Sequence, residues 1–414
     1  MKITNVEVYK FFSPKRKTDD AWGKWPIAKP LSLYEDFMKE KDFDILDLVA
    51  GACVVKITAE DGTYGLGYTG LYRESASFLE ECLKPHLMGM DAFEIEYAWD
   101  IMYKSCCAYG RTGLLIHAVS AIDMALWDLY GKAVGQPVYQ LLGGKVRDKI
   151  KAYATGPDFK LYKSLGYKAA KIPMPYGAMH GKEGIKKNIE AIAGVKEIMG
   201  DDAEIMLDCW MSWDTDYTVR IAKELEKYNV RWVEEPTMPD DYDGYKRCKE
   251  ILNGHGILVA GGEHEFTRWG ARKLIDLKCV DILQCDVCYV GGISELRKIN
   301  AYAEANGVKL IPHSHNLPTY HFSISSKNSP FAETLLDPNV PRLFTGEPQI
   351  ENGFIDVPDR PGFGYELNMD YGAFYKYEDG KYLYDDKFRT NLKDASLWNV
   401  GIPNETNTYV KGNE

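Results

Sequence analysis

The residues of this chain that point most directly to chemistry are three carboxylates, each placed at the end of a short apolar run. Asp208, Glu234 and Glu263 occupy these positions, 26 and 29 residues apart. That interval holds one strand, one helix and two loops, which is the length of a βα unit. If the strands are parallel neighbours, the three carboxylates converge, and their repulsion favours a bound divalent cation. A single acid at a strand end is more often a helix cap, but three at this spacing predict a metal site. Oxygen ligands alone favour Mg²⁺ over Zn²⁺.

Four further polar residues lie in or just after apolar runs at similar intervals: Lys171, Asp286, His313 and Glu333. Asp286 and His313 end consecutive predicted strands, and neighbouring strands lie about 4.8 Å apart. A carboxylate that accepts a hydrogen bond from one imidazole nitrogen makes the other nitrogen more basic, so His313 is a candidate general base. The alternatives are a structural role for His313 and a surface position for Glu333. Lys171 lies between apolar residues, which favours a cation that faces the same site.

These residues need parallel strands to bring them together, and the sequence provides the pattern for such strands. From about residue 149, strand-like runs alternate with amphipathic helical segments such as 216–227 and 293–305. Eight strands with helices between them predict a parallel βα barrel, in which catalytic groups sit at the carboxyl ends of the strands. The predicted strands are 149–155, 169–174, 204–208, 230–234, 257–263, 280–285, 307–312 and 332–337.

The two ends of the chain have a different pattern from the barrel. Residues 1 to about 75 alternate in strand fashion and include a hairpin turn at Asp61-Gly62. Residues 74–135 are predicted to be helical, and the segment 121–129 is apolar on most sides, which indicates a buried helix. The irregular insert between Phe11 and Asp44 is too long for a simple connection, so it is either a functional flap or a disordered tip.

Composition narrows the class of protein. The chain has 414 residues, is 45% hydrophobic and carries a net charge of −11, which disfavours nucleic acid as a partner. Its apolar runs are shorter than a membrane span, and its amino terminus is typical of a strand and not of a signal peptide. Nine irregularly spaced cysteines indicate a reduced, cytoplasmic protein. Cys285 and Cys288 match a C-x-x-C redox pair formally, but a barrel strand end makes that interpretation weak.

Several motifs are distributed over nearly the whole chain. They are Ala125-Leu126-Trp127-Asp128, Leu141-Leu142-Gly143-Gly144, Leu207-Asp208-Cys209-Trp210-Met211, Trp232-Val233-Glu234-Glu235, Gly262-Glu263-His264 and Val290-Gly291-Gly292. Together they resemble the motifs of the mandelate racemase subgroup of the enolase superfamily. That resemblance implies a modified (β/α)7β TIM-type barrel, closed over one Mg²⁺ by an α+β capping domain that is built from both ends of the chain. The expected divisions are 1–135 for the N-terminal part of the cap, 136–340 for the barrel with the active site, and 341–414 for a C-terminal segment that returns to the cap.

The resemblance also implies roles for individual residues. The counterparts of Asp208, Glu234 and Glu263 bind Mg²⁺, those of Asp286 and His313 form an acid/base dyad, and that of Glu333 hydrogen-bonds the enediolate. Lys171, His264 and Trp22 are expected to contact the substrate. The resemblance further implies a homo-oligomer that acts on a small molecule.

Within this subgroup the chain most resembles the rhamnonate dehydratase-like sugar acid dehydratases. Racemases of the subgroup have a second lysine where this chain has Pro173, which cannot transfer a proton, so racemisation loses support. The expected reaction is Mg²⁺-dependent dehydration of an aldonate to a 2-keto-3-deoxy sugar acid, with L-rhamnonate as the first substrate. Arabinonate, xylonate, gluconate or fuconate are alternatives, because the flap and the segment Ser314-His315-Asn316-Leu317 depart from the rhamnonate dehydratase pattern. A catalytically silent sugar-acid binding protein is the alternative of another class, and the presence of both Asp286 and His313 argues against it.

Overall fold

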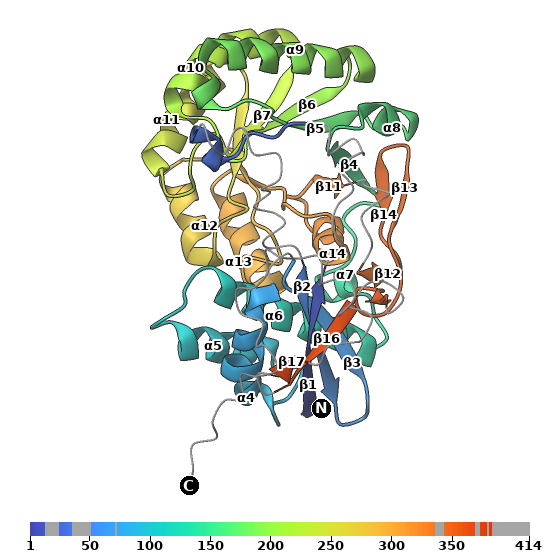
Figure 1. Ribbon diagram of the computed structural model, residues 1–414. Helices are drawn as coiled ribbons and strands as arrows, with labels where there is room; N and C mark the ends of the chain where they lie inside the picture. The colour runs from blue at the N-terminus through green and yellow to red at the C-terminus, as the bar shows by residue number, and fades with distance from the viewer. Residues whose placement is uncertain are drawn as a thin grey trace.

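Parallel strands and helices alternate between residues 150 and 335 and close into a barrel, drawn in green to orange in the upper part of Figure 1. Each of the strands β4 to β9 pairs in parallel with the next along the chain, so that the series ends at β10, and β11 pairs in parallel with β4. Among the described residues this gives eight parallel strands, which confirms the predicted barrel. The strands are β4 (Ile150–Thr155), β5 (Ala169–Pro173), β6 (Glu204–Asp208), β7 (Val230–Glu234), β8 (Leu258–Gly261), β9 (Ile282–Leu283), β10 (Lys309–Leu310) and β11 (Phe331–Leu335).

Within the described part of the barrel, seven α-helices connect the eight strands, as a (β/α)7β arrangement requires. Local signals in the sequence start several of them. Asp214 caps α10 by accepting a hydrogen bond from the backbone of Tyr217 at 2.7 Å, and Asn316 caps α14 in the same way. The helices are α8 (Phe159–Ser164), α9 (Gly181–Met199), α10 (Thr215–Leu225), α11 (Tyr242–Gly254), α12 (Thr267–Asp276), α13 (Gly292–Ala305) and α14 (Leu317–Ser325); the short 3-10 helices η4 (Ala178–His180) and η5 (Glu226–Tyr228) lie beside α9 and α10.

The interior of the barrel is packed with large side chains and is not a channel. Tyr153 and Trp232 are both fully buried and meet edge to face, with ring centroids 5.4 Å apart. Met206, Ile282 and Phe331 belong to the same cluster. This apolar floor leaves the carboxyl ends of the strands as the place where polar groups can gather.

An antiparallel sheet made from both ends of the chain forms the second part of the molecule, in the lower half of Figure 1. Its strand order is β17-β16-β1-β2-β3, so the C-terminal segment pairs with the first strand, as expected for a shared capping domain. The turn at Asp61-Gly62 connects β2 and β3 as predicted, with a positive φ of 86° at the glycine. The strands are β1 (Ile3–Phe12), β2 (Ala52–Ala59), β3 (Tyr64–Tyr68), β16 (Ala373–Glu378) and β17 (Lys381–Tyr382).

Helix α6 (Leu114–Ala133) packs on this sheet and is the buried helix that the sequence predicts. Strand β3 approaches it so closely that a Cβ atom at Gly65 or Gly67 would lie about 2 Å from a carbonyl oxygen of the helix. By length and composition α6 could cross a membrane, but 89% of its most apolar window is buried, as in the core helix of a globular domain. The cap also contains η2 (Arg73–Ser75), η3 (Phe78–Leu83), α4 (Lys84–Leu87) and α5 (Ile95–Cys106), and α7 (Val138–Leu141) follows α6.

The C-terminal segment contacts the barrel as well as the cap. The hairpin of β13 (Gln349–Glu351) and β14 (Phe354–Asp356) adds to the barrel, where β14 pairs antiparallel with β4 and buries Ile355 completely. Two short strands, β12 (Phe344–Thr345) and β15 (Glu366–Leu367), pair with each other on either side of the hairpin. The predicted segment 341–414 therefore lies against both parts of the molecule: its hairpin pairs with the barrel, Phe344 and Tyr365 contact β3 of the cap, and β16 pairs with β1.

The computed structural model describes part of the flap and most of the rest of the chain. Trp22 lies outside the described residues, whereas Trp25 and the short 3-10 helix η1 (Pro30–Leu33) lie within them. The described residues are 1–12, 25–34, 51–70, 73–335 and 343–368, together with the backbone of 373–378 and 381–382.

Candidate active site

Lys171 lies at the centre of a buried group of charges at the carboxyl end of the barrel. Its side chain has no exposed surface, and its Nζ lies 2.6 Å from Glu234, 3.0 Å from Glu333 and 3.4 Å from Asp208. Burial alone would lower the pKa of this lysine, but the three carboxylates raise it well above its ordinary value. Lys171 is therefore a fixed ammonium group, and its charge is directed at the buried carboxylates.

Two of the three predicted metal ligands, Asp208 and Glu234, meet at Lys171, whereas the third, Glu263, lies beside His264 and His313. Asp208 and Glu234 end the neighbouring strands β6 and β7 and share Lys171, and Glu263 follows β8 by two residues. Glu234 also accepts a hydrogen bond from Gln284 Nε2 at 2.9 Å. Burial raises the pKa of all three carboxyl groups, to about 8 for Glu234 and about 7 for Glu263.

Raised pKa values mean that these groups resist being ionised together without a further positive charge. A divalent cation would supply that charge, and an all-oxygen donor set suits Mg²⁺. The residues present therefore fit the predicted metal.

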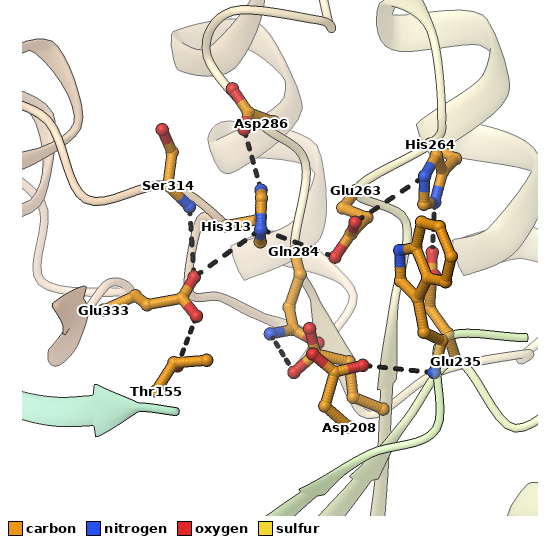
Figure 2. A network of polar contacts seen from close by, with 12 residues as sticks. Thr155, Asp208, Glu235, Glu263, His264, Gln284, Asp286, His313, Ser314 and Glu333 are labelled. Carbon is orange, nitrogen blue, oxygen red and sulfur yellow. Dashed lines mark hydrogen bonds and ion pairs between the residues drawn. The ribbon is translucent and has the colours of Figure 1, made fainter. Parts of the chain in front are cut away.

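A second set of groups shares Glu263 and includes a residue that the sequence reasoning missed. Glu235, Glu263 and His264 each place one ligand atom within 4.8 Å of the others (Figure 2). His264 Nδ1 lies 2.8 Å from Glu235 Oε1, and its Nε2 lies 3.6 Å from Glu263 Oε1. Burial alone would lower the pKa of His264, but these two carboxylates raise it to about 9. In its protonated form, His264 lies between Glu235 and Glu263 and offsets the charge of both acids.

Glu235 escaped prediction because side chains alternate along a strand, which directs a residue next to Glu234 away from the site. The backbone breaks that alternation with a φ of 43° at Glu235. The pair Glu234-Glu235 at a strand end was the available signal. Thr155 and Gln284 were also missed, although each lies at or next to the end of a barrel strand.

Asp286 and His313 meet as predicted. His313 Nδ1 lies 2.8 Å from Asp286 Oδ2 (Figure 2), and because a carboxylate only accepts, Nδ1 is the nitrogen that carries the proton. The other nitrogen, Nε2, lies 3.7 Å from Glu263 and 3.9 Å from Glu333. Burial alone would lower the pKa of His313, but Glu263, Glu333 and Asp286 together raise it well above its ordinary value. The basic nitrogen therefore faces the carboxylate cluster.

Glu333 is a buried member of the site and not a surface acid, since it is only 3% exposed. Its carboxylate accepts hydrogen bonds from the hydroxyl of Thr155 and from the backbone of Ser314, the latter at 3.2 Å (Figure 2). Burial alone would raise the pKa of Glu333, but Lys171 and His313 lower it below its ordinary value. Glu333 is consequently an acceptor in this structure.

The described part of the flap lies at the same end of the barrel. Trp25 donates a hydrogen bond from Nε1 to the carbonyl of Pro173 at 2.8 Å, and the backbone of Ala28 donates to Met174. Pro173 ends β5, the strand that carries Lys171. The sequence-based prediction that Trp22 contacts the substrate falls outside the described residues and stays a prediction.

Comparison with known proteins agrees with this geometry. Residues 159–371 match the family described as "Enolase C-terminal domain-like", and residues 49–143 match "Mandelate racemase / muconate lactonizing enzyme, N-terminal domain". The chain belongs to the mandelate racemase subgroup of the enolase superfamily and is an enzyme of that family. The family and the fold predicted from the sequence are both confirmed.

Among its relatives, three are informative about the particular enzyme. A protein of Caldivirga maquilingensis named "Putative L-rhamnonate dehydratase" is 41% identical over 363 residues, which cover 86% of this chain and 90% of that protein. The crystal structure of rhamnonate dehydratase from Gibberella zeae complexed with Mg is 33% identical, with a TM-score of 0.82 over 89% of this chain and 94% of that one. The 3,6-anhydro-D-galactonate cycloisomerase of Zobellia galactanivorans is 32% identical, with a TM-score of 0.75 over 89% of this chain and 98% of that one.

Proposed function

We propose that this protein is a Mg²⁺-dependent sugar acid dehydratase that converts an aldonate, in the first place L-rhamnonate, into its 2-keto-3-deoxy acid. The class, a hydro-lyase acting on a sugar acid, is supported by the dehydratase relatives and by membership of the family. The observation that carries the proposal is the Asp286–His313 pair, in which Asp286 holds Nδ1 and the other nitrogen, Nε2, faces the carboxylate cluster.

Asp208, Glu234 and Glu263 would hold the cation, with Lys171 and Gln284 fixing Glu234. Bound there, Mg²⁺ supplies positive charge that stabilises the enediolate as the substrate loses a proton beside its carboxylate. Such a proton is too weakly acidic for an imidazole base without this help.

His313 does the proton chemistry in this proposal. To act as the base, His313 must be neutral at Nε2, and neutralisation of Glu263 by a bound cation would remove part of the negative charge that raises the pKa of His313 in this structure. Nε2 would then take the proton from C2, while Asp286 keeps Nδ1 protonated and stabilises the imidazolium that forms. The protonated His313 then returns the proton to the C3 hydroxyl, which leaves as water. The resulting enol tautomerises to the 2-keto-3-deoxy acid, so that the balance of the reaction is the loss of one water molecule.

Glu333 is the residue expected to hydrogen-bond the enediolate. Donating such a bond needs a proton on Glu333, whereas Lys171 and His313 lower its pKa in this structure. A substrate carboxylate placed nearby would raise that pKa again, because like charges disfavour ionisation. The proposed role therefore depends on the bound substrate.

Three alternatives can be tested in the same experiment. A racemase needs proton-transfer groups on both faces of the substrate, and Pro173 occupies the position where a second lysine would stand. A catalytically silent binding protein does not require a histidine that is oriented for proton transfer by a carboxylate, as His313 is by Asp286. Another aldonate as substrate is compatible with every contact described above.

The test is a keto-acid assay on a panel of aldonates, namely L-rhamnonate, arabinonate, xylonate, gluconate, fuconate and 3,6-anhydrogalactonate. Metal-free protein should be inactive, Mg²⁺ should restore turnover, and Zn²⁺ should restore it poorly. Turnover by verified metal-free protein at the full rate would remove the metal from the proposal. Tight binding of an aldonate with Mg²⁺ present, but no keto acid and no exchange at C2, would favour the silent binding protein.

A further inference from the structure

The turn that carries Asp286 is short and strongly held. Inside the turn, the backbone of Cys288 donates to Asp286 Oδ1 at 2.6 Å. The backbone groups of Tyr289 and Val290 both donate to the carbonyl of Asp286, at 3.0 and 2.9 Å. The direction in which Asp286 presents its other oxygen to His313 is thus set by the turn 286–291.

The far end of this turn is fixed by the capping domain. Gly291 donates its N–H to Ser120 Oγ of α6 at 2.8 Å and accepts a hydrogen bond from Trp99 Nε1 of α5 at the same distance. All of these groups are buried, so neither half of the Gly291 backbone has water as a ready substitute. A Cβ atom at Gly291 would lie 3.2 Å from the ring of Trp99, which shows how closely the two parts approach.

The middle of the turn is enclosed by the cap as well. Tyr289 stacks on His117 of α6, with ring centroids 4.4 Å apart and planes 23° apart. A Cβ atom at Gly70, just after β3, would lie 3.0 Å from the Tyr289 ring. The cap therefore contacts the turn through three of its elements, β3, α5 and α6.

We propose that Trp99 and Ser120 are positioning residues for the proton-transfer step, because they hold the turn that aims Asp286 at His313. The inference deepens the proposed function and rests on it for its kinetic part. If this is correct, the orientation of the base depends on the cap side chains Trp99 and Ser120, which contact the turn at Gly291. The cap would then take part in the proton-transfer step as well as in covering the substrate. A misplacement of about 1 Å in a catalytic group can cost about 100-fold in rate, so loss of either contact should be visible in kcat.

A matched control exists in the same junction. Trp127 of α6 also donates its indole N–H across to the barrel, at 3.0 Å, but its acceptor is the side chain of Ser294 in α13 and not the turn. Both tryptophans are buried, and each lies beside an arginine side chain, Arg268 for Trp99 and Arg297 for Trp127. Trp99→Phe and Trp127→Phe therefore remove the same group from the same interface.

The kinetic experiment compares Trp99→Phe, Ser120→Ala and Trp127→Phe with the wild-type protein on the best aldonate of the panel. For the first two variants we expect kcat and C2 exchange in D₂O to fall by about 10- to 100-fold, with KM and Mg²⁺ affinity nearly unchanged. Trp127→Phe should keep the wild-type kcat even if it melts at a lower temperature. Equal losses of kcat in Trp99→Phe and Trp127→Phe would overturn the inference.

A second measurement does not depend on turnover. With ¹⁵N-labelled histidine, the Nδ1–H of His313 should give a downfield proton signal that exchanges slowly with water, assigned by its loss in Asp286→Asn. Trp99→Phe and Ser120→Ala should broaden it or speed its exchange at least about tenfold, and Trp127→Phe should not. An unchanged signal in the first two variants would refute the positioning role. If the wild-type protein turned over no aldonate, the proposed function would fail while this measurement would still decide the inference.

Discussion

At the scale of single residues, the proposed mechanism gives His313 two tasks, those of base and acid, that many enzymes divide between two groups. Its Nε2 faces Glu263 and Glu333, and its Nδ1 is held by Asp286. His313→Asn should lose dehydration and also C2 exchange in D₂O, by at least the ~10²–10⁴ typical of a general base, because one residue serves as both base and acid.

Asp286→Asn provides the companion measurement. It should keep Mg²⁺ affinity but lose much of the rate, because the imidazole would be less basic and wrongly oriented. NMR in D₂O measures the C2 exchange of both variants. If His313→Asn still exchanged the C2 proton at the wild-type rate, another base would exist, and the single-base argument built on Pro173 would fail.

Lys171 allows a prediction about stability. Removing one member of a buried ion group leaves the others uncompensated, so Lys171→Met should lower the free energy of unfolding of metal-free protein by about 3 kcal/mol. Mg²⁺ should stabilise the variant more than it stabilises the wild type, since the cation neutralises the same carboxylates. Denaturant unfolding with EDTA and with Mg²⁺ measures both effects. The exposed Lys186 is the control, and Lys186→Met should behave as wild type. An equal gain from Mg²⁺ in wild type and Lys171→Met would contradict the argument.

At the scale of elements, the strand-end rule explains what the sequence could reveal. Asp208 and Glu234 end β6 and β7 as predicted, because apolar runs of five residues define their strands clearly. Strands β9 and β10 are only two residues long, so Asp286 and His313 lie in the loops beyond them. Asp286 and His313 could still be predicted to lie together, because each follows one of two consecutive strands and these strands are neighbours in the barrel. The side-chain direction of Glu235 could not be derived from strand alternation. It is set by a positive φ at that one residue, and the sequence pattern of a strand gives no signal for such a turn.

Helix α14 contains a buried histidine, His321, that lies outside the site. Its lowered pKa leads to a prediction about how the stability of the protein depends on pH. His321 accepts a hydrogen bond from the backbone of Tyr139, and burial lowers its pKa from 6.5 to about 3. The folded pKa lies below the unfolded one, so the stabilising contribution is complete above pH 6.5 and is lost as pH falls toward 3. The slope is about 1.4 kcal/mol per pH unit.

His321→Gln tests this prediction, since its amide oxygen can accept the same hydrogen bond without titrating. Chemical unfolding between pH 7 and pH 4 should show a shallower loss of stability in the variant than in the wild type. His117 also has a pKa lowered to about 3 by burial, so some acid sensitivity should remain. Parallel pH profiles for variant and wild type would show that His321 is not the group responsible.

At the scale of the whole molecule, the two ends of the chain meet in one sheet, and this could be expected from family resemblance but not from periodicity. Pairing of β16 with β1 joins residues more than 360 positions apart, such as Phe374 and Phe11, and short strands carry no signal of their distant partner. The hairpin β13–β14 shows the same limit, because its pairing with β4 depends on an edge that exists only after the barrel has closed.

We expect the flap to select the substrate, and its described part gives the last prediction. Trp25 packs edge to face on Phe159 of α8, with ring centroids 5.7 Å apart, and its indole binds the carbonyl of Pro173. Trp25→Ala would release this anchor at the carboxyl end of β5. Because loops over a rigid barrel commonly carry specificity, we expect the variant to change the ratios of kcat/KM among aldonates more than its melting temperature. Trp25→Phe keeps an aromatic ring on Phe159 but loses the hydrogen bond. Its kcat/KM ratios should therefore lie between those of the wild type and of Trp25→Ala. Equal losses on every substrate, together with a lower melting temperature, would assign Trp25 to packing and leave specificity to other residues.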